Sequence, residues 1–339
     1  LPNSGIGSVA VTHDARWTVN TTGGILRPYF RYNSWEPKAA VAVPGVAFVG
    51  ADVDKSGPGL NYWMIAGAPN ADNGKGAAYI YNTNWSDNWQ QKQKISPPVG
   101  TNPYAFGSRV AISGPYAVVV SPDNHSLNWP GAAYVYELVG LTWQHVATLD
   151  PPDVYDADTG ECGPLTSMWG RSVAIDGGRI AIGAPIYDNG GVYLFQRYEG
   201  VWQFEKKLVR PKGPVCQSFF GWSVDLHGDR VLVGAPGNEQ QVDLYSGGSV
   251  MLYRLGKVYD DQPEDWYLIR YFYPDNDYIE FGASVSIAKD RIAIGAPLNM
   301  NEEGAVYVYR NVSPPMDRWV GVAGLSPFEH VPKHNLGGP

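Results

Sequence analysis

A stretch of 17 residues recurs along the chain, and this recurrence limits the fold more than any other feature of the sequence. Its clearest copy runs from Phe281-Gly282 to Gly295-Ala296-Pro297. Other copies run from Trp169-Gly170 to Gly183-Ala184-Pro185, from Phe220-Gly221 to Gly234-Ala235-Pro236 and, with an altered ending, from Phe106-Gly107 to Val120-Ser121-Pro122, while a fifth keeps only Gly67-Ala68-Pro69. Self-similarity of this kind indicates one supersecondary unit that is repeated and stacked on its neighbours.

Each copy of the stretch predicts a β-hairpin. In the clearest copy, Val285 and Ile287 alternate along one strand, and Ile292 and Ile294 alternate along the next, after a short polar turn. Such alternation on both sides of a turn is typical of two paired antiparallel strands. The small residues between the large ones suit a place where neighbouring sheets approach closely, and we expect this of Ala181, Gly183, Ala293 and Gly295. Proline ends the second strand because it has no N–H to donate.

Two further strands follow each hairpin. A polar, glycine-rich loop leads to an aromatic strand, such as residues 132–136, and a tryptophan then opens a fourth strand. Six tryptophans stand in this place at intervals of 53 to 64 residues: Trp35, Trp89, Trp143, Trp202, Trp266 and Trp319. Four strands in each of six repeats predict an all-β fold, a β-propeller of four-stranded blades.

The repeats fill nearly the whole chain, so we expect a single propeller domain over residues 1–325. The six blades are expected at about 1–43, 44–98, 99–150, 151–210, 211–272 and 273–325, with a C-terminal tail over 326–339. The first blade is the most divergent and has no Gly-Ala-Pro. Six blades are preferred, because a seventh would form only if the two ends of the chain combined.

Phe-Gly followed by Gly-Ala-Pro is the signature of the FG-GAP repeat, and the chain resembles the FG-GAP β-propellers, which include the head of the integrin α-subunit. The resemblance covers most of the chain; the motif is specific for the fold and weak for function. It implies an extracellular module that binds a protein or a glycan through the loops of one face.

The resemblance also implies a calcium loop between the first and second strands of a blade. One hairpin is long enough to hold it, with Asp52, Asp54 and Ser56 at alternating positions and Gly57 allowing a sharp turn. Oxygen ligands so spaced converge on Ca²⁺, and Asn61 is our candidate for the closing side. The alternative is a turn whose Asp side chains cap their own backbone. The acidic loops 153–161 and 275–277 are weaker cation candidates.

Composition excludes several classes of function. The net charge of −8 disfavours nucleic acid and anionic membranes as partners, since both require basic patches. The sequence contains no run of 18 apolar residues, so it predicts no membrane span. Gly-x-Ser-x-Gly, His-Glu-x-x-His and phosphate-loop motifs are all absent from the sequence. We therefore expect no enzyme and name no catalytic residue.

Three features indicate an extracellular location. The two cysteines, Cys162 and Cys216, each precede the first strand of adjacent repeats, so we expect a disulfide, the alternative being two free thiols. Four N-glycosylation sequons begin at Asn20, Asn84, Asn124 and Asn311. The chain starts at Leu1 without a leader, which fits a secreted protein whose signal peptide has been removed.

Three functions are compatible with these features. The preferred one is a secreted, non-enzymatic propeller that binds an extracellular protein or glycan. The second is a structural subunit that assembles with itself into an extracellular fibre or appendage. The third is a carbohydrate-active enzyme on a propeller scaffold. Exposed loop aromatics could stack on sugars, but nothing in the sequence identifies the ligand. These aromatics are Tyr104, Trp129, Tyr155, Tyr187, Tyr245 and Tyr278.

Overall fold

A computed structural model gives the fold of most of the chain. It describes residues 6–11, 17–22, 25–31, 35–43, 46–47, 50–55, 62–83, 89–101, 103–122, 124, 130–152, 168–186, 190–211, 218–237, 247–257, 263–274, 280–297, 304–313 and 317–325. The chain forms two compact units. The first comprises Leu1–Val154, Val173–Arg179 and Gln196–Gln203, and the second comprises Tyr155–Ser172, Ile180–Phe195 and Phe204–Pro339.

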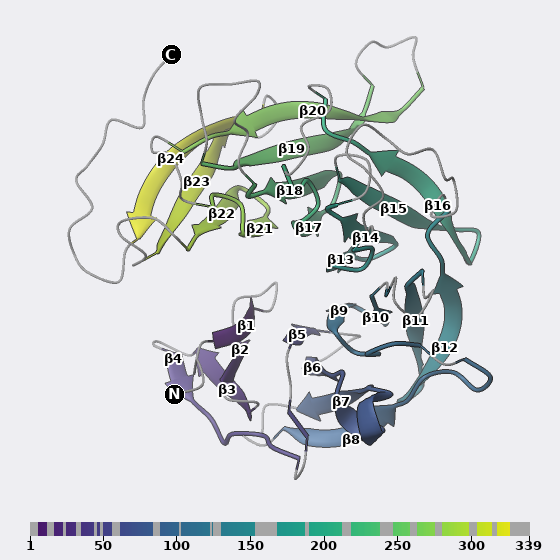
Figure 1. Cartoon of the computed structure of the whole chain (residues 1–339). Helices are drawn as coiled ribbons and strands as arrows, with labels where there is room; N and C mark the ends of the chain where they lie inside the picture. Colours follow the sequence, from purple (N-terminus) through teal and green to yellow (C-terminus); the bar gives the residue numbers. More distant parts are fainter. Residues whose placement is uncertain are drawn as a thin grey trace. The chain divides into compact units, whose positions relative to one another are not determined.

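Six four-stranded sheets make up the described fold, and in each the strands follow chain order (Figure 1). The first sheet holds β1 (Ile6–Val11), β2 (Trp17–Thr22), β3 (Ile25–Arg31) and β4 (Trp35–Pro37). The second holds β5 (Gly50–Lys55), β6 (Tyr62–Ala68), β7 (Ala77–Thr83) and β8 (Gln90–Ile95). The third holds β9 (Arg109–Ser113), β10 (Tyr116–Ser121), β11 (Ala132–Val139) and β12 (Thr142–Leu149).

The remaining three sheets repeat this order. The fourth holds β13 (Ser172–Asp176), β14 (Arg179–Ala184), β15 (Gly191–Tyr198) and β16 (Val201–Leu208), and it has residues in both units. The fifth holds β17 (Ser223–His227), β18 (Arg230–Ala235), β19 (Ser249–Gly256) and β20 (Asp265–Phe272). The sixth holds β21 (Ser284–Ala288), β22 (Arg291–Ala296), β23 (Ala305–Ser313) and β24 (Arg318–Leu325).

The predicted all-β propeller of four-stranded blades is thereby confirmed, with six sheets among the described residues. Each repeated stretch forms the first two strands of a sheet: Val224 pairs with Val233 in β17 and β18, and Val285 pairs with Ile294 in β21 and β22. The short segment α1 (Ala71–Gly74) is a turn and not a regular α-helix, because Asp72 and Asn73 have left-handed backbone angles with φ of +53° and +59°.

The two glycines of the repeat meet at the seam between neighbouring sheets. A Cβ built on Gly67 of the second sheet would lie 2.0 Å from the carbonyl oxygen of Gly107, which opens the third. In the same way, a Cβ built on Gly183 would lie 2.0 Å from the Gly221 carbonyl oxygen, and a Cβ built on Gly234 would lie 2.1 Å from the Gly282 carbonyl oxygen. Only hydrogen fits there, which explains why both motifs recur together and confirms the close approach predicted at Gly183. Gly295 instead faces Ser284 of its own sheet.

Hydrogen bonds reinforce the seam in the second unit. The Ser172 hydroxyl donates to the Gly221 carbonyl at 2.9 Å, and the Ser223 hydroxyl donates to the Gly282 carbonyl at 2.8 Å. Each of these carbonyls is the one that the glycine of the preceding sheet contacts. One backbone oxygen per seam is therefore both packed and hydrogen-bonded, which leaves little freedom for neighbouring sheets to slide.

Three of the tryptophans that open outer strands, Trp143, Trp202 and Trp319, pack on residues of the preceding sheet. Trp143 of the third sheet lies edge-on to Trp63 of the second, with ring centroids 5.5 Å apart. Trp202 meets Tyr116 in the same geometry at 5.5 Å, and Trp319 packs in a cluster with Leu232. Edge-to-face aromatic pairs of this kind hold packed elements at a fixed distance. The regular spacing of tryptophan in the sequence follows from this contact.

Candidate functional site

Two of the four predicted calcium ligands lie in the second sheet. Asp52 and Asp54 belong to β5, where Asp52 pairs with Ile65 and Asp54 pairs with Trp63. They occupy alternate positions, and alternate positions share one face of a strand. Ser56 and Asn61 lie outside the described residues, in the segment 56–61 between β5 and β6.

The donor set fits a hard cation in part. Two carboxylate residues at alternate positions next to a hairpin connection supply the oxygen type that Ca²⁺ prefers, but Ca²⁺ takes six to eight oxygens. Elsewhere in the described part of the chain, no group of three or more His, Cys, Asp or Glu side chains is placed to hold a metal ion. The acidic loops 153–161 and 275–277 lie outside the described residues.

The other predicted modification positions are described only in part. Cys162 and Cys216 lie outside the described residues, and so does Asn84. Asn20 pairs with Arg27 in the ladder of β2 and β3, and Asn124 is half-buried. The structure thus leaves the disulfide and these three sequons as predictions.

The fourth sequon residue, Asn311, is buried and hydrogen-bonded. Its side chain is 4% exposed; its amide nitrogen donates to Asp317 at 3.1 Å, and its amide oxygen accepts the Ser313 N–H at 3.1 Å. Asp317 also accepts hydrogen bonds from Arg230 and from Arg254, both of the fifth sheet, at 2.8 to 2.9 Å. A glycan on Asn311 would therefore have to break the network that ties the fifth sheet to the sixth.

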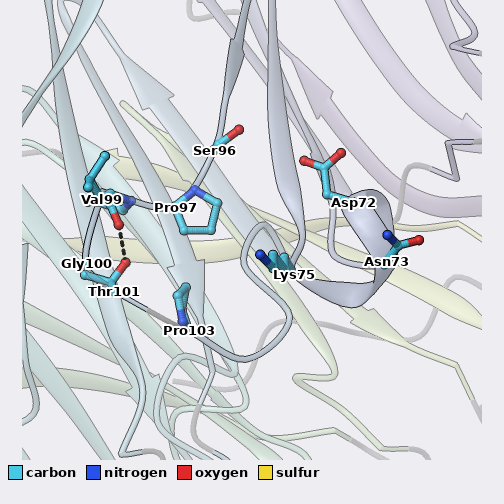
Figure 2. Close-up of a pocket in the computed structure, with 10 residues that line it drawn as sticks. Asp72, Asn73, Lys75, Ser96, Pro97, Val99, Gly100, Thr101 and Pro103 are labelled. Carbon is cyan, nitrogen blue, oxygen red and sulfur yellow. Dashed lines mark hydrogen bonds between the residues drawn. The ribbon is translucent and has the colours of Figure 1, made fainter.

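A pocket in the first unit brings two connecting loops together. One is the loop after β6, which contributes Asp72, Asn73 and Lys75, and the other is the connection that leads from β8 to the third sheet. The second loop contributes Ser96, Pro97, Pro98, Val99, Gly100, Thr101 and Pro103. The cavity measures about 540 Å³, and Figure 2 shows Lys75 between Asn73 on one side and Pro97 and Pro103 on the other.

The first wall of the pocket is formed by a left-handed turn. Asp72, Asn73 and Gly74 have φ values of +53°, +59° and +86°. Asn, Asp and Gly adopt this region at the least cost, so the sequence Asp-Asn-Gly suits the turn. The Gly76 N–H donates to the Ala71 carbonyl at 2.9 Å and closes the turn before β7 begins. This turn places the side chains of Asn73 and Lys75 on the surface.

A tight turn shapes the second wall. The Thr101 N–H donates to the Pro98 carbonyl at 3.1 Å, and Gly100 between them has φ of +85°. This is the pattern of a type II turn, which requires glycine at its third position. The Thr101 hydroxyl donates to the same carbonyl at 2.6 Å. The turn leaves Val99 at its tip fully exposed.

Charge in the pocket is distributed unevenly. Lys94 of β8 donates to Asp72 at 2.6 Å, and this hydrogen bond is the main reason why the pKa of Lys94 lies above its ordinary value. The Lys94 ammonium also lies 5.8 Å from the centroid of the Tyr79 ring. Asp72, the one carboxylate among the described lining residues, is therefore already neutralised. Lys75 has no ion-pair partner among the described residues and carries the remaining charge.

This arrangement suits ligand binding more than catalysis. The described lining offers an ammonium, an amide and proline rings, but it has no second carboxylate and no nucleophile beside a general base. Sequence reasoning treats these segments only as polar loops and misses the site. The Pro-Val-Gly-Thr turn can be predicted from sequence, but its proximity to Asp-Asn-Gly-Lys depends on tertiary structure.

Of the predicted loop aromatics, Tyr104 is 42% exposed next to the pocket residue Pro103. Trp129, Tyr155, Tyr187, Tyr245 and Tyr278 lie outside the described residues.

Comparison with known proteins confirms the FG-GAP resemblance. The family model of the FG-GAP repeat matches residues 89–136, 202–253 and 275–309. The chain is also similar to human integrin alpha-X, with 26% identity over 258 residues. That alignment covers 67% of this chain but only 20% of integrin alpha-X, so the chain spans about a fifth of the relative's length. None of the helices in the described part of the chain has the length and apolar character that a membrane crossing needs.

Proposed function

We propose that this chain is an extracellular, non-enzymatic adhesion module that binds a protein ligand through loops at one end of its sheets. The observation that carries the proposal is the similarity to integrin alpha-X, which extends over 67% of the chain and is joined by three matches to the FG-GAP repeat. A fold of this kind hosts many functions, so the pocket chemistry has to support the proposal independently.

The composition of the pocket supports binding over catalysis. Hydrolysis of a glycosidic bond usually needs two carboxyl groups at a defined separation, and the described lining has one, which is paired with Lys94. Pro97, Pro98 and Val99 offer apolar contact surface beside the polar groups of Asn73 and Lys75. Mixed surfaces of this kind, with a few placed polar groups, are typical of recognition sites.

We further propose that calcium binds the loop that begins in β5. Asp52 and Asp54 would hold the ion with Ser56 and Asn61, and water would complete the coordination shell. The ion would tie the connection 56–61 to the end of the strand and stabilise the second blade. Its removal should therefore lower thermal stability, whether or not the ligand contacts this loop.

The extracellular location has its own test. In protein isolated from its natural source, thiol labelling after denaturation without reduction should detect no free Cys162 or Cys216. Peptide mass spectrometry should find glycan on at least two of Asn20, Asn84 and Asn124, and none on Asn311, whose amide nitrogen is committed to Asp317. Two free thiols and bare asparagines throughout would contradict secretion.

Direct binding tests the function. The folded chain, immobilised on a sensor, is exposed to purified fibronectin, laminin, collagen and fibrinogen, and in parallel to a glycan array. The proposal expects saturable binding of at least one protein, weakened by Lys75→Glu and unchanged by Lys92→Glu. Lys92 is an exposed residue of β8 outside the pocket, where its ammonium donates to Gln90, so the control carries the same change of charge.

Two results would contradict the proposal. One is an absence of binding to every protein together with turnover of a polysaccharide, which would restore the enzymatic alternative. The other is binding that both variants weaken equally, which would place recognition outside the pocket. Selective binding to the glycan array alone would change the ligand class from protein to carbohydrate.

A further inference from the structure

Three arginines lie at one end of the sixth sheet and on the same face of it. They come from the neighbouring strands β22, β23 and β24 (Figure 1), and we call Arg291, Arg310 and Arg318 the arginine row. Trp319 is buried in the cluster shared with the fifth sheet, so Arg318 and Val320 on either side of it lie on the opposite face. Val320 is the ladder partner of Arg310, and Arg310 is the ladder partner of Arg291. Ladder partners share a face, so all three arginines lie together.

A single carboxylate is paired with the arginine row in the described part of the chain. Asp290 lies 3.2 Å from the Arg310 guanidinium and 3.9 Å from that of Arg291, and both arginine side chains are more than half exposed. Arg318 is exposed and has no ion-pair partner among the described residues. Lys289, in the turn before β22, is exposed as well. Four cations therefore stand beside one carboxylate, in a chain whose overall charge is −8.

The fifth sheet shows how the fold compensates such a pair when it serves stability alone. Arg230 and Arg254 are ladder partners in β18 and β19. They share two carboxylates, those of Asp229 and Asp317, at 2.7 to 2.9 Å. Like charges directly opposite one another in a ladder are destabilising, so the second carboxylate has a structural purpose there. The arginine row has no second carboxylate among the described residues, and an uncompensated cost of this kind indicates a use outside the fold.

The spacing of the row favours one class of polyanion. Neighbouring strands lie about 4.8 Å apart, so the row presents three guanidinium groups at short, regular intervals. An extended acidic peptide places its same-face carboxylates roughly 6.6 Å apart, which fits this spacing less well. Single-stranded nucleic acid is held by aromatic side chains that stack on its bases, whereas the neighbours of the row on this face are aliphatic: Ala293, Val308 and Val320. A sulfated polysaccharide carries anionic groups on successive rings, and their oxygens accept the paired N–H donors of guanidinium.

From these observations we propose that the arginine row binds a sulfated polysaccharide of the extracellular matrix. The row belongs to the second unit and shares no residue with the pocket of the first, so this inference goes beyond the proposed binding of a protein. The overall charge of −8 opposes polyanions at long range, so binding depends on the local row and weakens steeply with added salt.

A labelled heparin oligosaccharide tests the inference by fluorescence polarisation. The folded wild-type chain should bind it saturably at low ionic strength. Arg310→Ala and Arg318→Ala should each weaken binding by about two- to five-fold, the range of one exposed ion pair, and the double variant should weaken it by about the product of the two. Each substitution should also lower the slope of log Kd against log salt concentration by up to about one, because fewer counterions are released.

Arg27→Ala is the matched control. Arg27 is an exposed arginine of β3, outside the row, so its replacement makes the same change of charge and should leave heparin binding as in the wild type. Thermal melts check that each variant is folded. Arg310→Ala should melt with the wild type, because it removes one of two like charges that face each other in the ladder. Desulfated heparin of the same length, which keeps the carboxylates, should bind the wild type much more weakly.

Several outcomes would overturn the inference: no binding of heparin to the wild type, an equal loss in Arg27→Ala and Arg310→Ala, or equal binding of heparin and desulfated heparin. Displacement of heparin by a lower concentration of polyglutamate or single-stranded DNA would assign the row to another class of polyanion. The sensor assay with matrix proteins separates this inference from the proposed function. Protein binding without heparin binding refutes the polysaccharide site alone, and heparin binding without protein binding refutes the proposed function alone.

Discussion

The seam between the second and third sheets offers the clearest test of how the repeat determines the fold. Gly67 is the last residue but one of β6, and a Cβ at this position would lie 2.0 Å from the Gly107 oxygen and 3.0 Å from the Gly107 carbonyl carbon. It would also lie 3.2 Å from Cγ1 of Val110. Ordinary contact begins at 3.4 Å, so Gly67→Ala requires the facing backbone to retreat by more than 1 Å.

The facing backbone has little room to retreat. The Gly107 N–H donates to the Val120 carbonyl at 3.0 Å, and Gly107 has φ of +90°. A Cβ on Gly107 itself would meet the Ala77 oxygen at 2.3 Å, so the seam is tight from both sides. Overpacking against a flexible side chain costs ~1–3 kcal/mol, and backbone resists movement more, so we expect a loss of about 3 kcal/mol for Gly67→Ala.

Thermal unfolding followed by circular dichroism measures this loss. The unfolding entropy for 339 residues is about 0.7 kcal/mol/K, so a loss of ~3 kcal/mol should lower Tm by about 4 °C. The matched control is Gly178→Ala: a Cβ there would meet only Cβ of Arg197, at 3.9 Å, and Gly178 does not need a positive φ. The control should be neutral or raise Tm by about 1 °C, because alanine lowers the entropy of the unfolded chain.

This reasoning would be refuted if Gly67→Ala melted within ~1 °C of the wild type while Gly178→Ala behaved as expected. Equal losses in both variants would also refute it, because they would indicate a general cost of replacing glycine. Urea unfolding provides a second reading, in which the midpoint should fall with an unchanged slope.

Three further predictions concern charged groups. Asp317→Asn should lower the free energy of unfolding, measured in urea, by about 2–3 kcal/mol, because the 7% exposed carboxylate compensates the charges of the Arg230 and Arg254 guanidinium groups. A loss below ~0.5 kcal/mol would contradict a structural role for these ion pairs. Lys206 and the Trp266 N–H donate to Asp265 and hold its pKa below 3.8, so the contribution of Asp265 to stability is present above pH 3.8 and is lost as the pH falls through the lower pKa of the folded state. The difference in Tm between wild type and Asp265→Asn should therefore shrink below pH 3.8. A difference that stays constant with pH would exclude the ion pair as its cause. Calcium should raise the Tm of the wild type but not of Asp54→Ala, and an unchanged wild-type melt after EDTA would remove the calcium proposal.

Local periodicity was sufficient to predict the sheets. Alternation at Val285 and Ile287, proline after each Gly-Ala, and tryptophan at the head of the outer strands are all short-range signals. The structure shows Val285 and Ile287 in a strand ladder and shows Trp143, Trp202 and Trp319 packed on the preceding sheet. Even the altered copy is explained locally, since the Ser121 hydroxyl that replaces an alanine donates to the Tyr104 carbonyl. These features could be predicted because each repeat makes the same contact with its neighbour.

Contacts between residues distant in sequence could not be predicted in the same way. Arg230 and Asp317 are 87 residues apart and belong to different repeats, so nothing in either repeat indicates their pairing. Asn311 shows the consequence, because its sequon predicts an exposed acceptor whereas the pairing network buries it. The pocket was missed for the same reason, since it forms where the loop that holds Asp72 meets the connection after β8, and Asp72 pairs with Lys94, which is 22 residues further along the chain.

Adhesion of cells to the purified chain tests the central claim most directly. Wells are coated with equal amounts of wild type, Lys75→Glu or Lys92→Glu, and the attached cells are counted after washing, with and without calcium. The account predicts that cells attach to the wild type and to Lys92→Glu and attach several-fold less to Lys75→Glu. Absence of attachment to the correctly folded wild type, or equal attachment to all three proteins, would contradict an adhesion module that binds through this pocket.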